Sequence, residues 1–409
     1  MRDKESQFFS RLEGAPAPAF ILGGGDSHVL AFLRSLGRKG IPVVAVNTVR
    51  GLGRWSRYCL KIQQAGLKGE TELLSFLEQV GMKLPTRGVL ISTSDEGVLF
   101  MIRNRSYLSQ YYNFVLTEEP TLPNLLSKKL QYEYAVRIGI PTPQTYFLER
   151  PGDIERVADT VSYPCLIKPV YSHLWRKYRE RLGRKDGSKV VQADSPQELL
   201  QCYSQMAESG VELVVQERVG GEDDQLYALY SYFNRSSEPL AVFVKSKLRQ
   251  WPVNYGDGSL AISVLQKEVV DYGLKLLKAL DYRGLVSIEF KRDSKDSQFK
   301  LIEINVRSGS QVMLSIDSGV DIPYIAYRDI SGEPIEPAIS YRVGVKWIDL
   351  QLDWKSYLEH RRRKHLGFWS WISSISNSRS YAYLAWDDPV PFLIHASRLI
   401  KRLIWKALD

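Results

Sequence analysis

The 409-residue sequence contains only three cysteines, Cys59, Cys165 and Cys202. Their odd number and wide spacing exclude a disulfide framework and the usual zinc-binding patterns, and they predict reduced thiols and a cytoplasmic location. The chain has no apolar run of about 18 residues, so no membrane-spanning helix is expected. Its first residues, MRDKESQFFSRLEG, lack the apolar core of a signal peptide.

Histidine is also scarce. The five histidines show neither the spacing of a zinc site nor that of a nucleophile and its base. The sequence has no internal repeat and no low-complexity tract, which excludes a repeat architecture. With 44% hydrophobic and 25% charged residues the composition is that of a globular protein, and the length predicts two or three subdomains.

Acidic residues are outnumbered by basic ones, which gives a net charge of +9. Residues 341–409 hold twelve Lys and Arg against six Asp and Glu. The basic run HRRRKH at 360–365 has no aromatic platform or recognition motif beside it, so we expect no nucleic-acid partner. We interpret the run as a solvated helix face or as a contact for an anionic partner.

The last residues, PFLIHASRLIKRLIWKALD, have the pattern of a basic amphipathic helix. Ala396, Leu399 and Ile400 recur at helical spacing, with Arg398 and Lys401 between them. Two interpretations stay open: the helix packs on the protein body, or it lies on the anionic inner face of a membrane. The sequence does not reveal the oligomeric state, for which a homodimer is the commonest arrangement.

The N-terminal part has the pattern of a βαβ unit. Apolar residues fill positions 19–22, three glycines follow, a segment with helical periodicity covers 29–36, and a second apolar run covers 42–46. Two further runs, in GVLISTSDEGVLF and YNFVLTEEP, predict two more strands. We therefore expect residues 1–118 to form an α/β domain with an open parallel sheet.

After residue 118 the pattern changes. NLLSKKLQYEYAVRIGIPTP and EVVDYGLKLLKALDY have helical periodicity, whereas YPCLIKPV, VELVVQERV, LYALYSYFN and LAVFVKSKLRQ predict strands. The last two strands are joined by the short turn RSSEP, which predicts antiparallel neighbours. This part is therefore expected to be α+β, with antiparallel sheets.

The stretch KLIEINVRSGSQ, residues 300–311, places polar side chains inside an apolar run. Strict alternation along a strand predicts that Ile302, Ile304 and Val306 share one face. The other face would then carry Leu301, Glu303, Asn305 and Arg307.

Carboxylate and amide side chains on neighbouring strands indicate a hard divalent cation. Glu289 lies in the preceding strand, VSIEF, while Glu303 and Asn305 share a face of the next. Mg²⁺ prefers such oxygen ligands, completed by substrate phosphates, and Mn²⁺ is the alternative ion. Lys128 at a helix start and Lys168 at a strand end supply the point charges that phosphates need. The pattern predicts a site for a nucleoside triphosphate and its metal.

These segments occur in the order found in the ATP-grasp superfamily, which residues 18–330 resemble. The resemblance implies an N-terminal open parallel-sheet pre-ATP-grasp (Rossmann-like) domain at 1–118. A two-lobed ATP-grasp fold of antiparallel sheets with helices would follow, with lobe 1 and a basic phosphate loop at 119–215 and lobe 2 with the Mg²⁺ site at 216–332. Residues 333–409 would form a basic C-terminal extension.

The resemblance also implies residue roles. It identifies Lys128 in SKKLQYEYAVRIGIPTP and Lys168 in YPCLIKPV as the ATP lysines, with Lys129 as the alternative to Lys128. VVQERVGG resembles the strand that binds adenine, and KSKLRQWP resembles a phosphate-binding strand. ATP binding is thereby assigned to Gln216, Glu217, Val219, Asp224 (or Asp223) and Lys247, metal binding to Glu289, Glu303 and Asn305, and catalysis to Arg307 and Arg249.

Within the superfamily, KPVYSHLWRKY and AWDDPVP resemble carboxylate–amine ligases of the D-aspartate-ligase type. Such a ligase joins a carboxylate to an amine through an acylphosphate and releases ADP and phosphate. Two features depart from the family pattern: Ser127 stands where typical members carry Asp, and the loop at 171–189 is basic rather than rich in Gly and Ser. The alternative is an ATP-binding regulatory or assembly protein without turnover.

Three polar segments remain for the substrates. GGGDSH is not a full G-x-G-x-x-G, and no acidic residue ends the following strand, so nicotinamide binding is not expected. Gly24 and Asp26 line the substrate pocket or form a tight turn. Ser94 and Asp95 in STSDE bind substrate, or Ser94 caps a helix. His173 in the basic loop is placed near phosphate or the amine, with a structural role as the alternative.

Overall fold

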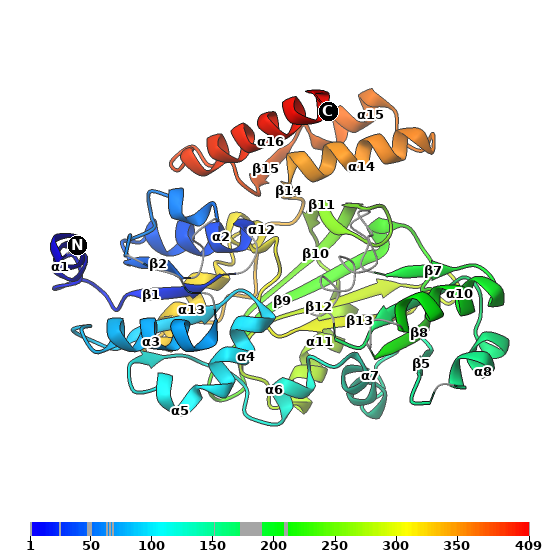
Figure 1. The fold of residues 1–409 in the computed structure, drawn as a ribbon, viewed down its shortest axis with the longest axis horizontal. Helices are drawn as coiled ribbons and strands as arrows, with labels where there is room; N and C mark the ends of the chain where they lie inside the picture. Colours follow the sequence, from blue (N-terminus) through cyan, green and yellow to red (C-terminus); the bar gives the residue numbers. More distant parts are fainter. Residues whose placement is uncertain are drawn as a thin grey trace.

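The computed structural model describes residues 2–23, 26–46, 51–62, 64, 67, 69–150, 152–171, 190–207 and 212–408, with side chains from residue 6 to residue 401. Gly24 and His173, both predicted to lie near the substrate, fall outside the described residues, as do residues 172–189 of the predicted basic loop. In Figure 1 an N-terminal α/β part adjoins a region of long strands, and three helices from the end of the chain lie above both.

The N-terminal part is built on a parallel sheet, as predicted. Ile21 and Ala45 pack on one side with α2 (Asp26–Gly37), whereas Phe20 and Val44 pack on the other side with α3 (Glu70–Gly81). Burial of both faces explains why these strands are uninterrupted apolar runs. The sheet order is β2 (Val43–Val46), β1 (Ala19–Leu22), β3 (Gly88–Ser92) and β4 (Tyr112–Asn113). Around it lie α1 (Arg2–Ser10), η1 (Gly53–Trp55), α4 (Asp95–Arg103) and α5 (Arg105–Leu108).

A second, four-stranded sheet is antiparallel throughout. One face is covered by α8 (Asp153–Thr160) and α10 (Pro196–Ala207), which bury Cys165 and Ile167 between sheet and helices. The strand order is β5 (Thr145–Phe147), β8 (Leu213–Glu217), β6 (Cys165–Pro169) and β7 (Val191–Ala193). The segment before this sheet forms α6 (Thr121–Asn124) and α7 (Lys128–Arg137).

The third sheet has seven strands and crosses the middle of the molecule. One face packs on α7 and α11 (Lys267–Ala279), while part of the other packs on α2, α12 (Val312–Ser318) and α13 (Ile322–Ile330). The order is β13 (Phe299–Asn305), β12 (Gly284–Arg292), β9 (Leu226–Phe233), β10 (Pro239–Trp251), β11 (Asp257–Ser263), β14 (Lys346–Ile348) and β15 (Ser378–Tyr381). A short 3-10 turn, η3 (Asp223–Gln225), precedes β9. As predicted, β9 and β10 are antiparallel neighbours.

The C-terminal segment is integrated into this architecture. Strands β14 and β15 extend the seven-stranded sheet, so residues 333–409 share a sheet with the segment before them. The layer at the top of Figure 1 consists of α14 (Leu350–Arg362), α15 (Phe368–Ile375) and α16 (Val390–Leu408). The helix expected at the end of the chain is therefore present. Among the described residues no helix is long and apolar enough to cross a membrane.

Two adjacent aspartates tie this layer to the N-terminal part. Asp388 forms a buried ion pair with Arg34 of α2 at 3.0 Å and accepts a hydrogen bond from Ser56 at 2.8 Å. Asp387 binds Arg38 of α2 with two hydrogen bonds of 2.7 and 2.8 Å. The AWDDPVP segment therefore fixes the start of α16 on the protein body. Residues further along α16 remain more open, with Leu393 and Ile400 more than half exposed.

Candidate active site

Two carboxylates face each other across neighbouring strands of the seven-stranded sheet. Glu289 of β12 is paired in register with Glu303 of β13, and Asn305 lies two residues further along β13. Like charges placed directly opposite destabilise a sheet unless cations neutralise them. The same row of the sheet continues through Ala228 of β9 to Lys245 of β10, so these side chains lie on one face.

The alternation predicted for residues 301–307 is wrong at one point. The register between β12 and β13 shifts between Glu289 and Phe290, because Phe290 pairs with Leu301 while Glu289 pairs with Glu303. Ile302 is the extra residue of a bulge, which reverses the alternation. Leu301 therefore shares the core face with Ile304 and Val306, where all three are buried, and Glu303 and Asn305 face the opposite side.

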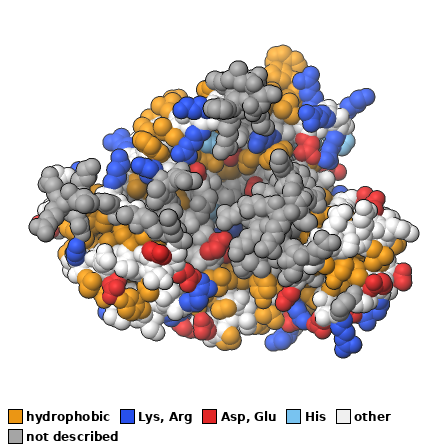
Figure 2. Space-filling view, in the orientation of Figure 1, with side chains coloured by type: hydrophobic (Ala, Val, Ile, Leu, Met, Phe, Trp, Pro, Cys, Tyr) orange, Lys and Arg blue, Asp and Glu red, His pale blue; other side chains and the backbone are white. Residues whose placement is uncertain are grey.

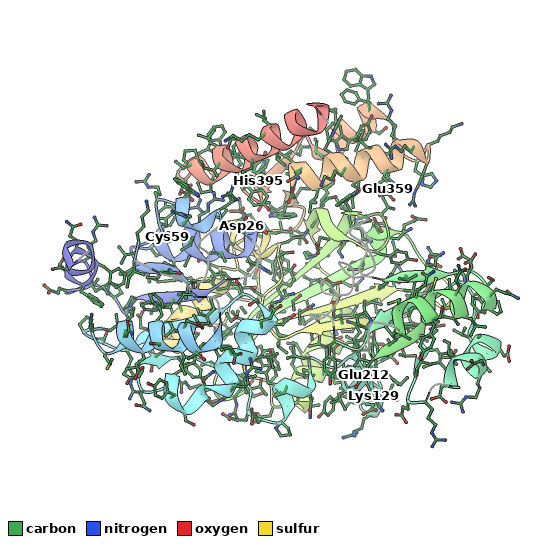
Figure 3. The ribbon with its side chains drawn as sticks, in the orientation of Figure 1. Asp26, Cys59, Lys129, Glu212, Glu359 and His395 are labelled. Carbon is green, nitrogen blue, oxygen red and sulfur yellow. The ribbon has the colours of Figure 1, made fainter. Side chains whose placement is uncertain are left out.

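Lys128 of α7 neutralises one of the two carboxylates. Its Nζ atom lies 2.6 Å from Oε1 of Glu303, and its side chain is buried. Helix α7 is held in place by Gln131, whose side-chain amide donates to the carbonyl of Ile304 and accepts from its backbone N–H, both at 2.8 Å. Lys129 instead points to the outer edge of α7, where it pairs with Glu149 (Figure 3). The geometry therefore favours Lys128 over Lys129.

Lys168 of β6 lies in the same polar region. Its Nζ atom is 2.5 Å from the side-chain oxygen of Gln216 and 3.4 Å from the hydroxyl of Tyr132. Burial lowers the pKa of Lys168 to about 8, an effect opposed by the charge of Glu303. This lysine therefore loses its charge much closer to neutral pH than an exposed lysine does.

If Lys168 binds phosphate, as the sequence predicts, its lowered pKa should make that binding pH-dependent. A phosphate binds the protonated ammonium, so the dissociation constant for ATP should rise by up to about tenfold per pH unit above pH 8. The measurement is calorimetric titration of ATP with excess Mg²⁺ between pH 7 and pH 9.5. The variant Lys168→Arg keeps its charge over this range and should show a flatter profile. Identical profiles for the two proteins would contradict a role of Lys168 in phosphate binding.

The predicted adenine-binding segment connects the four-stranded sheet to the seven-stranded sheet. Gln216 also donates to the hydroxyl of Thr145 at 2.6 Å, and Glu217 forms an ion pair of 3.0 Å with Lys300 of β13. The carbonyl of Val219 accepts a hydrogen bond of 3.2 Å from Lys291 of β12. This segment therefore links lobe to lobe beside the polar row.

The two aspartates that follow this segment have different environments. Asp224 is exposed. Asp223 is buried and accepts a hydrogen bond of 2.6 Å from Gln250, and burial raises the pKa of its carboxyl group. The structure keeps both residues within the same 3-10 turn.

The two residues of β10 predicted to bind phosphate, Lys247 and Arg249, point to different parts of the molecule. Lys247 has its Nζ atom 3.8 Å from Glu289, within the polar row. The register of β10 shifts after Lys247, and Arg249 instead binds Asp353 of α14 through two hydrogen bonds of 2.9 and 2.7 Å. A third nitrogen of Arg249 donates to Ser374 at 2.8 Å. The structure thus brings Lys247 to the carboxylates and engages Arg249 with the C-terminal layer.

Arg307 lies where the N-terminal part meets the seven-stranded sheet. Its Nε atom is 3.1 Å from Oδ1 of Asp95 in α4, and its Nη2 atom is 3.5 Å from Asn305. Two residues predicted from distant segments are therefore brought together. Ser94 accepts a hydrogen bond from the backbone of Gly97 and is the N-cap of α4, as its alternative interpretation states. Asp26, at the start of α2 in Figure 3, accepts a hydrogen bond of 2.7 Å from the backbone N–H of Leu52.

The arrangement matches known structures. The chain superposes on N5-carboxyaminoimidazole synthetase from Staphylococcus aureus complexed with ADP with a TM-score of 0.63 and 17% identity, covering 86% of this chain and 87% of that one. For biotin carboxylase from Campylobacter jejuni the TM-score is 0.61 and the identity 13%, with 82% and 75% covered. For L-amino acid ligase from Bacillus licheniformis they are 0.54 and 15%, with 79% and 75% covered. The chain has the ATP-grasp fold.

Sequence comparison finds relatives of low identity that match only part of the chain. D-aspartate ligase from Enterococcus faecium is 21% identical over 254 residues, which cover 59% of this chain and 58% of that protein. The large chain of carbamoyl phosphate synthase from Methanoculleus marisnigri is 23% identical over 217 residues, or 51% of this chain and 19% of that protein. The chain thus spans less than two thirds of these curated relatives. No family model matches it.

The donor set of this ATP-grasp chain fits a magnesium ion. Glu289 and Glu303 offer carboxylate oxygens, and Asn305 an amide oxygen, on one face of the sheet. Mg²⁺ typically takes one or two protein carboxylates and completes its shell with substrate phosphates and water. Among the described residues, no group of three or more His, Cys, Asp and Glu side chains is placed to hold a metal ion.

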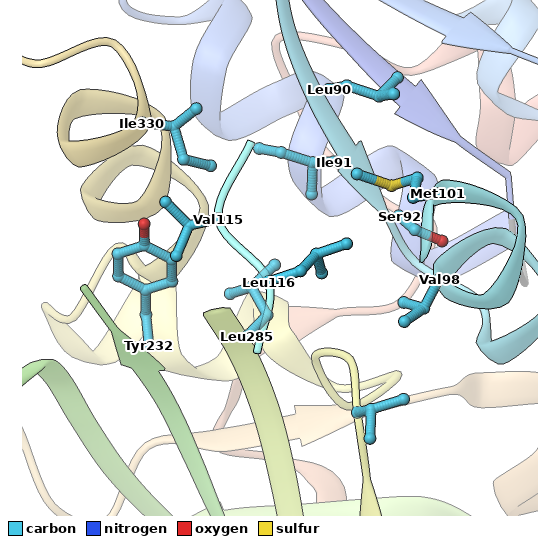
Figure 4. A pocket seen from close by; sticks show the side chains of 11 residues that line it. Leu90, Ile91, Ser92, Val98, Met101, Val115, Leu116, Tyr232, Leu285 and Ile330 are labelled. Carbon is cyan, nitrogen blue, oxygen red and sulfur yellow. The ribbon is translucent and has the colours of Figure 1, made fainter. Parts of the chain in front are cut away.

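The cavity in Figure 4 lies outside this polar region. It has a volume of about 20 Å³ and lies where β3 and α4 meet the ends of β9, β12 and β13. Its lining is almost entirely apolar, with Ser92 and Tyr232 contributing the polar atoms. A void of this size holds at most one water molecule. It is a packing defect between two subdomains and not a substrate pocket.

Sequence reasoning missed three residues that lie in or beside the candidate site. Lys245 lies in the row with Glu289, and burial lowers its pKa to about 7. Its i, i+2 spacing with Lys247 was a visible signal. His28 of α2 is buried, and burial, with the charge of Arg307 second, lowers its pKa to about 3. Lys300 forms ion pairs with Glu217 and Asp293. For His28 and Lys300 no local pattern existed, because their partners are far away in the sequence.

Proposed function

We propose that the protein is an ATP-dependent carboxylate–amine ligase that forms an amide through an acylphosphate and releases ADP and phosphate. One observation carries the proposal: the opposed carboxylates Glu289 and Glu303 each have a lysine of another element beside them, Lys247 and Lys128. Alternating cationic and anionic groups of this kind suit a metal ion bound between protein oxygens and phosphates. Mg²⁺ in such a site neutralises phosphate charge and polarises the transferred phosphoryl group.

The residues of this chain have separate parts in the proposed reaction. Lys128 and Lys168 bind phosphate oxygens from the side of lobe 1, and Lys247 from lobe 2. Gln216, Glu217 and Val219 hold the base, and Asp224 the ribose. Their combined role is charge neutralisation and positioning, because phosphoryl transfer needs little covalent chemistry from a protein.

Arg307 is the proposed catalytic residue. A guanidinium group presents a planar fork of donors that matches carboxylate and phosphoryl oxygens. Its ion pair with Asp95 and its contact with Asn305 fix its orientation beside the metal ligands. His28 remains neutral near Arg307 because of its low pKa, so it offers hydrogen bonds without adding charge.

The test is an ADP-release screen with Mg-ATP, a panel of amino and hydroxy acids and a panel of amines, with mass spectrometry for the new amide. We expect ADP release that requires one acid and one amine together. Binding of ATP without ADP release for any pair would contradict the ligase and favour a regulatory ATP-binding protein. To test for the acylphosphate, hydroxylamine is added in place of the amine. Formation of the hydroxamate of the acid together with ADP would support the intermediate.

A further inference from the structure

Helix α15 is apolar but contributes no buried side chain. Its sequence is FWSWISSI, and none of its residues is buried in the structure. The side chain of Trp369 is 79% exposed and that of Phe368 is 45% exposed. Surface helices normally bury their apolar face against the protein, so this helix lacks a partner for large aromatic groups.

The exposed aromatic residues belong to one contiguous cluster. Ring contacts join Phe368 to Trp369 at 5.4 Å, Trp354 to Trp371 at 5.4 Å, and Tyr357 to Trp371 at 4.8 Å between centroids. Phe368 contacts Trp371 as well, at 5.9 Å. We call Trp354, Tyr357, Phe368, Trp369 and Trp371 the aromatic cluster.

The aromatic cluster has a rigid base. Tyr357 is fully buried, and the indole N–H of Trp371 donates to Asp353 at 2.8 Å. Asp353 is itself held by Arg249 and by the hydroxyl of Ser259. The exposed rings of Trp354, Phe368 and Trp369 therefore stand on a fixed support, which lowers the entropic cost of binding through them.

A basic turn lies beside the aromatic cluster. Arg361, Arg362, Arg363 and Lys364 are all exposed, at the end of α14 and just before α15. In Figure 2 hydrophobic side chains at the top right of the molecule are bordered by Lys and Arg in this region. Aromatic residues on both sides of the HRRRKH run in sequence therefore fold next to it, which the sequence analysis did not anticipate.

The nearby acidic residues neutralise only part of this surface. Asp353 is buried with Arg249, and Glu359 pairs with Arg363 at 2.6 Å. Asp387 and Asp388 pair with Arg38 and Arg34 of the N-terminal part. Glu359 thus offsets one of the four charges of the basic turn, and the turn keeps a net positive charge on its exposed residues.

We propose that the aromatic cluster and the basic turn bind the surface of an anionic membrane, with α15 in the headgroup region. Trp and Phe side chains partition into that region, and Arg and Lys beside them are attracted to anionic headgroups. The positive charge of the basic turn is complementary to the negative charge of such headgroups, and this complementarity favours an anionic membrane as the partner. The contact lies on α14 and α15, whereas the start of α16 is fixed to the protein body by Asp387 and Asp388.

Two features favour a membrane over a nucleic acid. Apolar and basic residues are segregated here, since FWSWISSI contains no charged residue. Surfaces that bind single-stranded nucleic acid instead combine basic side chains with aromatic side chains on which nucleobases stack. The rings of Phe368 and Trp369 also contact each other edge to face, at an interplanar angle of 69°, and do not form a flat stacking surface. The proposal does not depend on the ligase chemistry.

The test is co-sedimentation of the full chain with vesicles of phosphatidylcholine, alone and mixed with phosphatidylglycerol. We expect binding to the mixed vesicles, reduced at least about tenfold by the double substitution Phe368→Ser and Trp369→Ser. The matched control is Trp386→Ser, because Trp386 is 90% exposed but lies outside the aromatic cluster. The substitutions Arg361→Gln, Arg362→Gln and Lys364→Gln should abolish the preference for anionic vesicles.

Several outcomes would overturn the proposal. Failure of the wild-type protein to sediment with either vesicle type would do so. Binding of the aromatic variant within twofold of wild type, like that of the control, would do so as well. If the aromatic substitutions instead abolish a dimer in sedimentation velocity, the surface binds a second copy of this chain. If the Gln substitutions instead abolish binding to a single-stranded oligonucleotide, the surface binds nucleic acid. Thermal melting followed by circular dichroism shows that each variant is folded.

Discussion

Replacing Glu303 by Gln should lower the rate of ADP release by about 10²–10³-fold while the protein remains folded. The substitution keeps the shape of the side chain but removes one of two carboxylates in the proposed metal site. It also removes from Lys128 the negative charge of a carboxylate that lies 2.6 Å from its Nζ atom. Phosphoryl transfer depends on charge neutralisation, so the loss should appear mainly in kcat.

The chain provides a matched control for Glu303→Gln. Glu149 forms an ion pair of the same length, 2.6 Å, with the adjacent lysine, Lys129, but on the exposed side of α7. Glu149→Gln should therefore leave kcat and ATP affinity within about twofold, because exposed ion pairs contribute little. The two variants are compared by steady-state ADP release and by calorimetric ATP titration. Full activity of Glu303→Gln would refute the metal site; lost ATP affinity in a protein that never turns over would favour the regulatory alternative.

Replacing Asp353 by Ala should destabilise the protein by about 3–5 kcal/mol. Asp353 is fully buried and accepts two hydrogen bonds from Arg249, one from Ser259 and one from Trp371. Its removal leaves the buried guanidinium of Arg249 without a countercharge. The measurement is urea unfolding followed by far-UV circular dichroism at pH 7.

Two further variants help to interpret the effect of Asp353→Ala on stability. Asp271 pairs with Lys267 on an exposed helix face, so Asp271→Ala should change the unfolding free energy by less than about 0.5 kcal/mol. The double substitution Arg249→Met and Asp353→Leu should recover much of the lost stability, because apolar groups replace the whole buried pair. Loss of ATP binding in that stable double variant would show that Arg249 also contacts phosphate, as the sequence predicts. A stable Asp353→Ala protein would contradict the structural role.

Several features of the site were predictable from sequence because they depend on local order. The parallel N-terminal sheet follows from uninterrupted apolar runs, and the β9–β10 hairpin from a short turn. The placement of Glu289 and Glu303 on adjacent strands follows from the two strands and the short connection between them. The cap formed by Ser94 follows from its position before the apolar residues of α4.

Other features depended on contacts that no local pattern encodes. The bulge at Ile302 reversed the expected alternation, because a register shift is a property of two paired strands and not of one. Arg249 lies one residue beyond a similar shift in β10 and turns to Asp353, which is 104 residues away. The partner of Arg249 could not be predicted, because Asp353 lies in a distant segment.

By itself the sequence determined the order of strands and helices, the residue types available for a metal and phosphates, and the choice of an ATP-grasp arrangement. These follow from hydrophobic periodicity and from short motifs, which act over a few residues. Only the tertiary structure decided that Lys128 and not Lys129 meets Glu303, that Arg307 meets Asp95, and that α15 stands uncovered beside four basic residues. Those outcomes depend on the packing of separate subdomains, where burial and countercharges are set by residues far apart in the chain.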